Sequence, residues 1–112
     1  YIDGFFSGDA VRMERGIHPE INKVTAVTSP VTGKSYFSKM GSGPLIEYTG
    51  AKFGLRDKEK REITVRIMDS MDNLASVEVI SATLIDYLQL AKMNGNWKII
   101  NVLWKSKPLT TK

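Results

Sequence analysis

Apolar and β-branched residues alternate with polar residues from Glu62 to Lys105, a pattern typical of β-strands. Two groups of turn residues, 71–73 and 93–96, interrupt this alternation. Neighbouring strands joined by short turns form an antiparallel meander. The pattern therefore predicts a three-stranded meander, with strands at 62–70, 74–92 and 97–105.

The second interruption contains Asn94-Gly95, a pair that tolerates the positive φ angles of a type I′ hairpin turn. If these two residues form the centre of the turn, the partners on the two strands follow by counting outward. One face of the hairpin then carries six side chains: Leu90, Ile99, Leu88, Asn101, Asp86 and Leu103. The other face carries Ile85, Tyr87 and Gln89 with Ile100, Val102 and Trp104.

Both faces of this predicted hairpin are largely apolar, so both need a cover. We expect helices of the same chain to cover one face and a second copy of the chain to cover the other. This interpretation predicts a homodimer with Tyr87, Val102 and Trp104 in its interface. For Tyr87 and Trp104, a platform for stacking a flat ligand is the alternative.

The start of the chain predicts two short helices. Tyr1–Phe6 has the apolar spacing of the end of an amphipathic helix, and Asp9 is placed to cap a second helix over 10–17. His18-Pro19 ends this second helix, since a residue that precedes proline avoids the helical region.

The next segment predicts a strand pair and a third helix. Alternation indicates strands at 21–28 and 34–40 around a turn, and we interpret 45–53 as a short helix. The order of helices and strands predicts an α+β fold, in which helices on one side of a strongly bent sheet enclose a pocket.

Length and composition indicate one domain over residues 1–112, with 42% hydrophobic and 25% charged residues. No apolar run approaches the roughly 20 residues that a membrane span requires, so we expect no membrane partner. No signal peptide is visible, which slightly favours a cytoplasmic location. The chain begins at Tyr1 rather than methionine, and this leaves open that a leader or part of the first helix has been removed.

The charge pattern and the rarity of metal-binding residues exclude several classes of site. The net charge is +4, but the densest charged run, 56–62, mixes both signs and has no aromatic residue, so nucleic-acid binding is not favoured. The absence of cysteine excludes disulfides and thiolate metal sites, and the single histidine excludes any site that needs two. No carboxylates have metal-ligand spacing, so we expect neither a metal nor another cofactor.

Three segments resemble the NTF2-like superfamily: Y-I-D-G-F-F-S-G-D at the start, H-P after the second helix, and D-Y-L-Q-L followed by N-G-N-W-K-I-I-N. Within it, the chain is most similar to the putative lumazine-binding branch, near the SnoaL-like group. The resemblance implies a cone-shaped, cystatin-like α+β fold, frequent homodimers packed through the sheet, and a variable pocket between the sheet and the first helix.

Ketosteroid isomerases of this superfamily use a helix tyrosine and a late-strand aspartic acid as an oxyanion hole, and an apolar site keeps this acid protonated. The resemblance places Tyr1 and Asp86 at these two positions. The position of the catalytic base falls near Thr25, which is not a base at neutral pH. The chain therefore departs from the isomerase pattern at the residue that moves the proton.

Asp86 is the main candidate for chemistry because a carboxylate among apolar side chains is costly unless it is hydrogen-bonded or neutralised. It is either a pocket acid with a raised pKa or a structural acid bonded to a helix group or to Tyr1. His18 is the second catalytic candidate, with a capping or packing role as the alternative.

The predicted ligand pocket contains Tyr1, Asp86, Asn101, Leu88 and Leu103. The favoured function is binding of a small, partly apolar organic molecule. A SnoaL-type or dehydratase/isomerase-like enzyme and a dimeric assembly module are the alternatives.

Overall fold

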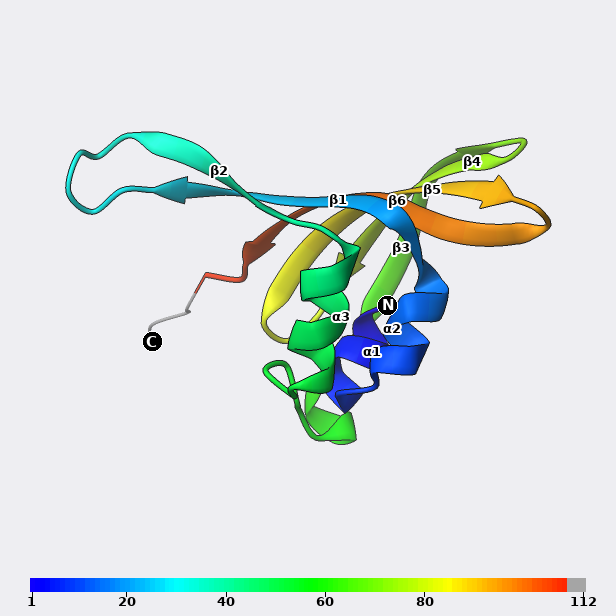
Figure 1. Ribbon diagram of the computed structural model, residues 1–112, viewed down its shortest axis with the longest axis horizontal. Coiled ribbons are helices and arrows are strands. Elements are labelled where there is room, and N and C mark those ends of the chain that lie inside the picture. The colour runs from blue at the N-terminus through cyan, green and yellow to red at the C-terminus, as the bar shows by residue number, and fades with distance from the viewer. Residues whose placement is uncertain (109–112) are drawn as a thin grey trace.

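The computed structural model describes residues 1–108, in which three α-helices lie on one side of a six-stranded sheet (Figure 1). The helices are α1 (Ile2–Ser7), α2 (Ala10–Gly16) and α3 (Ser42–Gly50), and a 3₁₀ turn spans Lys58–Lys60. The strands are β1 (Ile17–Thr28), β2 (Ser35–Met40), β3 (Thr64–Met71), β4 (Leu74–Ile80), β5 (Leu84–Met93) and β6 (Asn96–Ser106). This arrangement confirms the predicted α+β fold.

The strand order is β2-β1-β6-β5-β4-β3, and every pairing is antiparallel except that of β1 with β6. The first strand of the chain therefore lies beside the last. The β1–β2 hairpin continues past the body of the sheet as a protruding arm (Figure 1). We call the sheet face that packs on the helices the inner face and the opposite face the outer face.

The helix boundaries follow from the local chemistry that the sequence predicts. Helix α1 ends at Gly8, whose φ of 66° suits glycine at a helix C-terminus. The Asp9 side chain caps α2 by accepting a hydrogen bond from the backbone N–H of Arg12 at 3.1 Å. Strand β1 begins directly after α2, and its pairing with β6 is irregular between Ile17 and Asn22.

The predicted three-stranded meander is wrong in one respect, because the segment 74–92 forms two strands rather than one. A turn at Ser81 separates β4 from β5. The Ser81 N–H donates to the Leu84 carbonyl at 2.9 Å, and the Ser81 hydroxyl accepts from the Leu84 N–H at 3.2 Å. A serine side chain thus completes a turn that contains neither glycine nor proline.

The predicted register of the β5–β6 hairpin is correct from the turn to Leu90, which lies opposite Ile99. The pairing then shifts by one residue, and Gln89 lies opposite Asn101. Ile100 is the extra residue of this bulge. Because side chains alternate across a sheet, one extra residue exchanges the faces of every later residue on β6.

The shift corrects the predicted faces of the hairpin. Asp86 lies opposite Trp104 and Leu88 lies opposite Val102, so these four residues share the inner face. Tyr87 lies opposite Leu103 on the outer face. The prediction that Val102 and Trp104 lie with Tyr87 on an exposed dimer face is therefore wrong.

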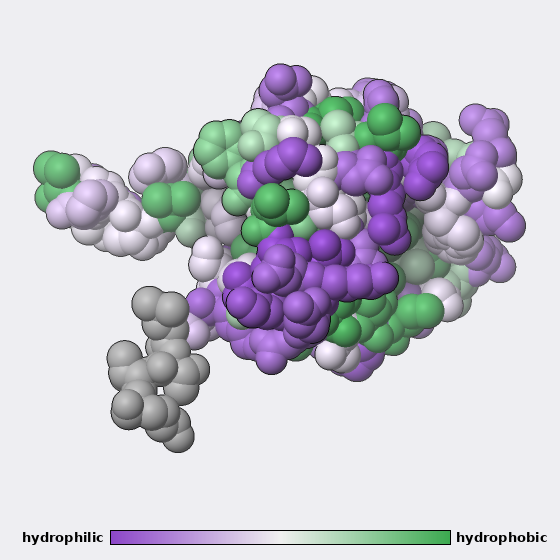
Figure 2. Space-filling view, turned by 90° about the horizontal axis from the view of Figure 1, so that it is seen from below, coloured by the Kyte–Doolittle hydropathy of each residue, from purple (hydrophilic) through white to green (hydrophobic). Residues whose placement is uncertain are grey.

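The hydrophobic core lies between the inner face and the helices. Its buried side chains are Ile2, Phe6, Met13, Ile17, Ile21, Leu45, Val77, Val79, Leu88, Ile99 and Val102. The space-filling view from the helix side shows hydrophilic side chains gathered over the middle of the surface, with smaller hydrophobic areas around them (Figure 2).

Candidate functional site

A connected set of three polar side chains crosses the inner face. Tyr1 directly precedes α1, Lys23 lies on β1, and Asp86 lies on β5. The Lys23 ammonium donates to the Tyr1 hydroxyl at 2.7 Å, and this hydroxyl donates to Asp86 Oδ1 at 3.1 Å. Lys23 is 7% exposed and Asp86 is fully buried. We call these three residues the polar triad.

Aromatic rings surround the charged end of Lys23. Its Nζ lies 5.1 Å from the ring centroid of Tyr1, 5.6 Å from that of Phe5 and 5.2 Å from that of Trp104. A cation within about 6 Å of an aromatic face is attracted by the ring quadrupole. Tyr1, Phe5 of α1 and Trp104 of β6 therefore form a cage around the amine that β1 provides.

Burial shifts the protonation of all three groups in the triad toward their neutral forms. It raises the pKa of Asp86, against the opposing effects of the Lys23 charge and the Tyr1 hydrogen bond. It lowers the pKa of Lys23, although the charge of Asp86 acts in the other direction. Burial, with the nearby carboxylate, raises the pKa of the Tyr1 phenol well above its ordinary value.

The second oxygen of Asp86 is buried and has no hydrogen-bond partner within residues 1–108. Buried polar atoms nearly always have a partner, and those that lack one mark strain, chemistry or a bound molecule. Asp86 is thus buried, as its costly position in the sequence pattern predicted, and no group in residues 1–108 forms a hydrogen bond with its second oxygen.

A cavity of about 120 Å³ lies next to the triad, between the helices and the sheet. We call it the inner cavity. Its walls come from α1, α3, β1, β2 and β6 and contain Phe5, Lys23, Thr25, Ser38, Lys39, Met40, Leu45, Tyr48 and Trp104. Lys23 therefore belongs both to the triad and to the wall of the cavity.

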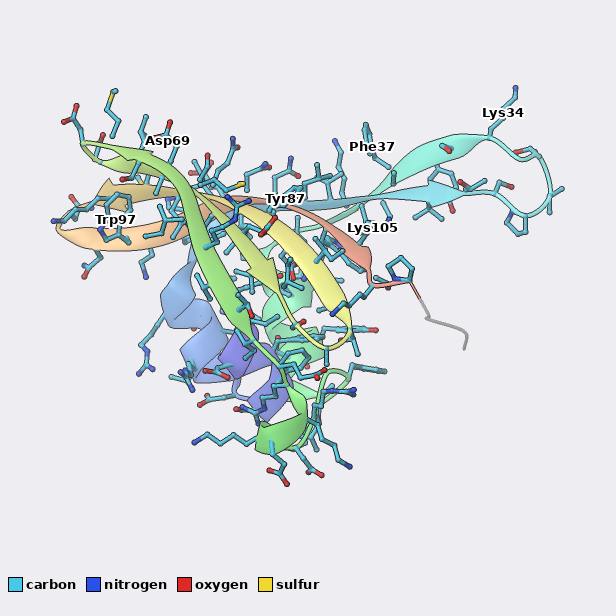
Figure 3. The ribbon with its side chains drawn as sticks, turned by 180° about the vertical axis from the view of Figure 1, so that it is seen from behind. Lys34, Phe37, Asp69, Tyr87, Trp97 and Lys105 are labelled. Atoms are coloured by element: carbon cyan, nitrogen blue, oxygen red, sulfur yellow. The ribbon has the colours of Figure 1, made fainter. Side chains whose placement is uncertain are left out.

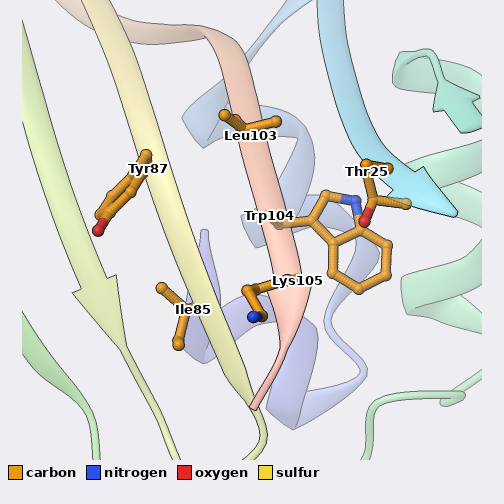
Figure 4. A pocket seen from close by; sticks show the side chains of 7 residues that line it. Thr25, Ile85, Tyr87, Leu103, Trp104 and Lys105 are labelled. Carbon is orange, nitrogen blue, oxygen red and sulfur yellow. The ribbon is translucent and has the colours of Figure 1, made fainter. Parts of the chain in front are cut away.

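A larger cavity, of about 390 Å³, lies where β1 and β6 diverge (Figure 4). This outer cavity is lined by Thr25, Ala26, Ile85, Tyr87, Leu103, Trp104 and Lys105. Figure 4 shows Trp104 beside Thr25 in the space between the two strands. Both residues line the inner cavity as well, so the two cavities adjoin.

The structure brings together only part of the predicted pocket. Tyr1, Asp86 and Leu88 lie on the inner side, and Tyr1 contacts Asp86 as the structural interpretation of this acid anticipated. Asn101 and Leu103 lie on the outer face with Tyr87, because of the bulge. They are therefore separated by the sheet from Asp86, contrary to the predicted register.

His18 lies at the start of β1, away from the triad. Its Nδ1 accepts a hydrogen bond from the backbone N–H of Glu20 at 3.0 Å. This is a contact with the local backbone of β1, and the structure does not bring His18 to the triad. Within residues 1–108, no group of three or more histidine, cysteine, aspartate or glutamate residues has the geometry of a metal site.

Lys23 is the site residue that sequence reasoning missed. Lys23 lies two residues after the buried Ile21 on the same strand, so the two side chains point to the same face of the sheet. This spacing was the available signal for an inward-facing lysine. A lysine in an exposed-looking run such as Asn22-Lys23 is usually assigned to solvent. Its cage depends on Trp104, whose face is set by a bulge that alternation does not reveal.

None of the helices in the described part of the chain is long and apolar enough to cross a membrane.

Comparisons with known proteins support the fold. The sequence matches the model of the family described as "Putative lumazine-binding" over residues 1–105. No curated protein matches it.

Three solved structures share this architecture, and each is an NTF2-like protein of unknown function. The protein from Silicibacter pomeroyi has a TM-score of 0.74 at 14% identity, over 96% of this chain and 87% of that one. The protein from Shewanella baltica has a TM-score of 0.70 at 14% identity, over 97% and 86% of the two chains. The protein from Methylobacillus flagellatus has a TM-score of 0.62 at 18% identity, over 96% and 84%.

Proposed function

Because the chain belongs to the family described as "Putative lumazine-binding" and has an NTF2-like fold, we propose that it binds a small organic molecule in the inner cavity. The ligand is flat, partly apolar and carries a carbonyl oxygen. The observation that carries this proposal is the buried, caged amine of Lys23 in the cavity wall, which the Tyr1 hydroxyl connects to Asp86.

The chemistry of the cavity wall supports this type of ligand. Phe5, Tyr48 and Trp104 offer aromatic surface on which a flat ring stacks. Lys23 offers an N–H donor for a carbonyl oxygen, and a donor in a dry site contributes more than it does in water. Ligand sites of this design combine apolar walls with a few fixed polar groups.

The size of the inner cavity limits the ligand. Drug-sized ligands occupy pockets of roughly 300–1,000 Å³, and the inner cavity measures about 120 Å³. A single small ring system therefore fits, or one end of a larger molecule that continues toward the adjoining outer cavity.

Binding is tested with lumazine itself as the probe, since it is a flat bicycle with two carbonyl groups. Native mass spectrometry of the purified protein first reveals any molecule retained from the cell, and titration calorimetry with lumazine then gives the affinity. We expect Lys23→Met to weaken binding on the order of tenfold, the effect of losing a donor of about 1.4 kcal/mol.

Lys105→Met is the matched control, because Lys105 lines only the outer cavity. It should leave the affinity unchanged. Stronger weakening by Lys105→Met than by Lys23→Met would move the site to the outer cavity. If no small molecule is retained and lumazine does not bind, the proposal is wrong.

We also propose that a second copy of the chain covers the outer face. A band of exposed apolar side chains crosses this face and includes Phe37, Leu103 and Tyr87, which are 67%, 48% and 44% exposed. Figure 3 shows Phe37 on the protruding arm and Tyr87 on the body of the sheet. Exposed apolar side chains gathered on one face are typical of protein interfaces. Only Tyr87 is retained from the three interface residues that the sequence predicted.

A further inference from the structure

We propose that Lys23 forms a reversible Schiff base with an aldehyde or ketone held in the inner cavity, with Tyr1 passing the proton between Lys23 and Asp86. This inference rests on the proposed ligand site and adds a covalent step to it. The ligand class narrows accordingly, from molecules that carry a carbonyl oxygen to those with an electrophilic carbonyl carbon.

The position of Lys23 distinguishes it from the other lysines in the described part of the chain. It is the one lysine among them that is buried, and it also lines a cavity between the helices and the sheet. An amine is nucleophilic only when it is neutral, and a desolvated lysine in an apolar pocket reaches that form more readily. Burial lowers the pKa of Lys23 in this way.

The hydrogen bonds provide a path for the proton that must leave the ammonium. Lys23 Nζ is 2.7 Å from the Tyr1 hydroxyl oxygen, which is 3.1 Å from Asp86 Oδ1. When the ammonium gives its proton to the phenol oxygen, the phenol gives its own proton to Asp86. The products are a neutral amine and a neutral carboxylic acid, the two forms that burial favours.

The covalent step then follows with all atoms accounted for. The lone pair of Lys23 attacks the carbonyl carbon, a C–N bond forms, and one proton moves from the nitrogen to the former carbonyl oxygen, which becomes a hydroxyl. The C–O bond of this carbinolamine breaks as Asp86 returns its proton through Tyr1 to the departing hydroxyl, and water leaves. Overall, one ammonium and one carbonyl compound give one protonated imine and one water, with no oxidant or reductant.

The aromatic cage suits the product as well as the reactant. The protonated imine carries its positive charge on the same nitrogen, which stays within reach of the rings of Tyr1, Phe5 and Trp104. Cation–π attraction therefore supports the charge before and after the reaction. Asp86 does not reach the cavity wall, so it acts through Tyr1 as a positioning residue rather than as a catalytic one.

The inference is tested by trapping the imine on the wild-type protein. The protein is incubated with benzaldehyde and sodium cyanoborohydride, which converts an imine into a stable benzyl amine. Intact mass counts the adducts, and peptide mapping locates them. We expect Lys23 to be labelled on the order of tenfold faster than Lys105, a matched lysine at the outer cavity, although Lys23 is the less exposed of the two.

Variants separate chemistry from structure. Lys23→Arg keeps a cation in the cage but forms no imine, so the fast adduct should disappear while circular dichroism shows a folded protein. Tyr1→Phe removes the proton path and should slow labelling at Lys23 by about tenfold or more. Labelling at Lys105 should be unchanged in both variants.

The pH dependence gives an independent readout of the triad. The charged and titratable groups that face Lys23 are Tyr1 and Asp86, with Lys39 on the cavity wall. Labelling at Lys23 should reach its plateau below the pH expected from the ordinary lysine pKa of about 10.4. The Asp86→Asn variant removes the negative charge that holds the proton on Lys23, and it should move this plateau to still lower pH.

The outcomes distinguish the two proposals. If lumazine binds but Lys23 is labelled no faster than Lys105, the Schiff base is wrong and the noncovalent site stands. If lumazine does not bind and Lys23 is not labelled, both proposals fail. Fast labelling that persists in Lys23→Arg would place the reactive amine elsewhere and would also overturn the inference.

Discussion

The two faces of the sheet depart from ordinary burial in opposite directions. On the inner face, the charged residues Lys23 and Asp86 are 7% and 0% exposed. On the outer face, the apolar residues Leu103 and Tyr87 are 48% and 44% exposed. The inner face buries charged groups that are usually solvated, and the outer face exposes apolar groups that are usually buried.

The difference indicates two kinds of partner. Buried charges are costly unless fixed donors and acceptors surround them, and such fixed groups recognise a small molecule with its own polar atoms. An exposed apolar band offers area without fixed polar geometry, which suits the surface of another protein. This contrast supports the two proposals made above, a small-molecule site on the inner face and an assembly surface on the outer face. Each of the following experiments tests this comparison.

The largest effect is expected from two leucines that the sequence register placed on the same face. Leu88 is 5% exposed and Leu103 is 48% exposed. Leu88→Ala leaves a hole in the core and should lower the free energy of unfolding by about 2–5 kcal/mol. Leu103→Ala should change it by less than about 0.5 kcal/mol in the monomer.

Urea denaturation at low protein concentration measures both values. Similar losses for the two variants would mean that the outer face is buried within the monomer itself, and the contrast between the faces would not hold. If Leu103→Ala lowers the free energy of unfolding only at high protein concentration, the loss comes from a weakened dimer. That result would strengthen the contrast between the two faces.

A smaller effect is expected from Asp86→Asn, and it depends on pH. Because the pKa of Asp86 is raised, the native protein binds this proton more tightly than the unfolded chain. The stabilisation that comes from this tighter proton binding is fully present below the ordinary carboxyl pKa near 3.9. It is lost as the pH rises through the pKa of Asp86 in the folded protein.

The asparagine variant has no such dependence. Its stability relative to wild type should therefore increase with pH across that window, with a slope of at most about 1.4 kcal/mol per pH unit. Thermal melts at a series of pH values measure the difference, with the exposed Asp69→Asn as control. A difference that is constant with pH would show that Asp86 has an ordinary pKa.

The smallest effect is expected at the outer face. Leu103→Glu places a charge in the apolar band and should raise the dimer dissociation constant by about tenfold or more, or 1.4 kcal/mol. Sedimentation velocity over a concentration series measures it. Val11→Glu is the control, because Val11 is 68% exposed on α2, away from this face. A wild-type protein that remains monomeric at the highest concentration would remove the proposed dimer.

Local patterns predicted the fold well and the site less well. Turn chemistry and alternation gave the α+β class, the helices, the β1–β2 hairpin and the hairpin register as far as Leu90. They missed the Ser81 turn, because a serine side chain forms it without glycine or proline. They also missed the bulge at Ile100, since an extra residue in one strand leaves the alternation of each strand intact.

The errors at the site follow from those at the fold. Tyr1 and Asp86 were paired by family resemblance, and their hydrogen bond is present. Trp104 was assigned to the outer face by the uncorrected register, so its contact with Lys23 was not foreseen. The parallel pairing of β1 with β6, which brings these two residues together, leaves no mark in either strand alone.

That parallel pairing has a consequence for how the protein is made. During translation, the segment with Tyr1 and Lys23 leaves the ribosome before Trp104, which follows Lys23 by about 80 residues. Contacts across so long a loop carry a large closure entropy and form late in folding. A nascent or truncated chain that lacks β6 therefore has a solvated Lys23 without its full cage. The proposed reactivity of this amine would therefore develop only after β6 has been made and has paired with β1.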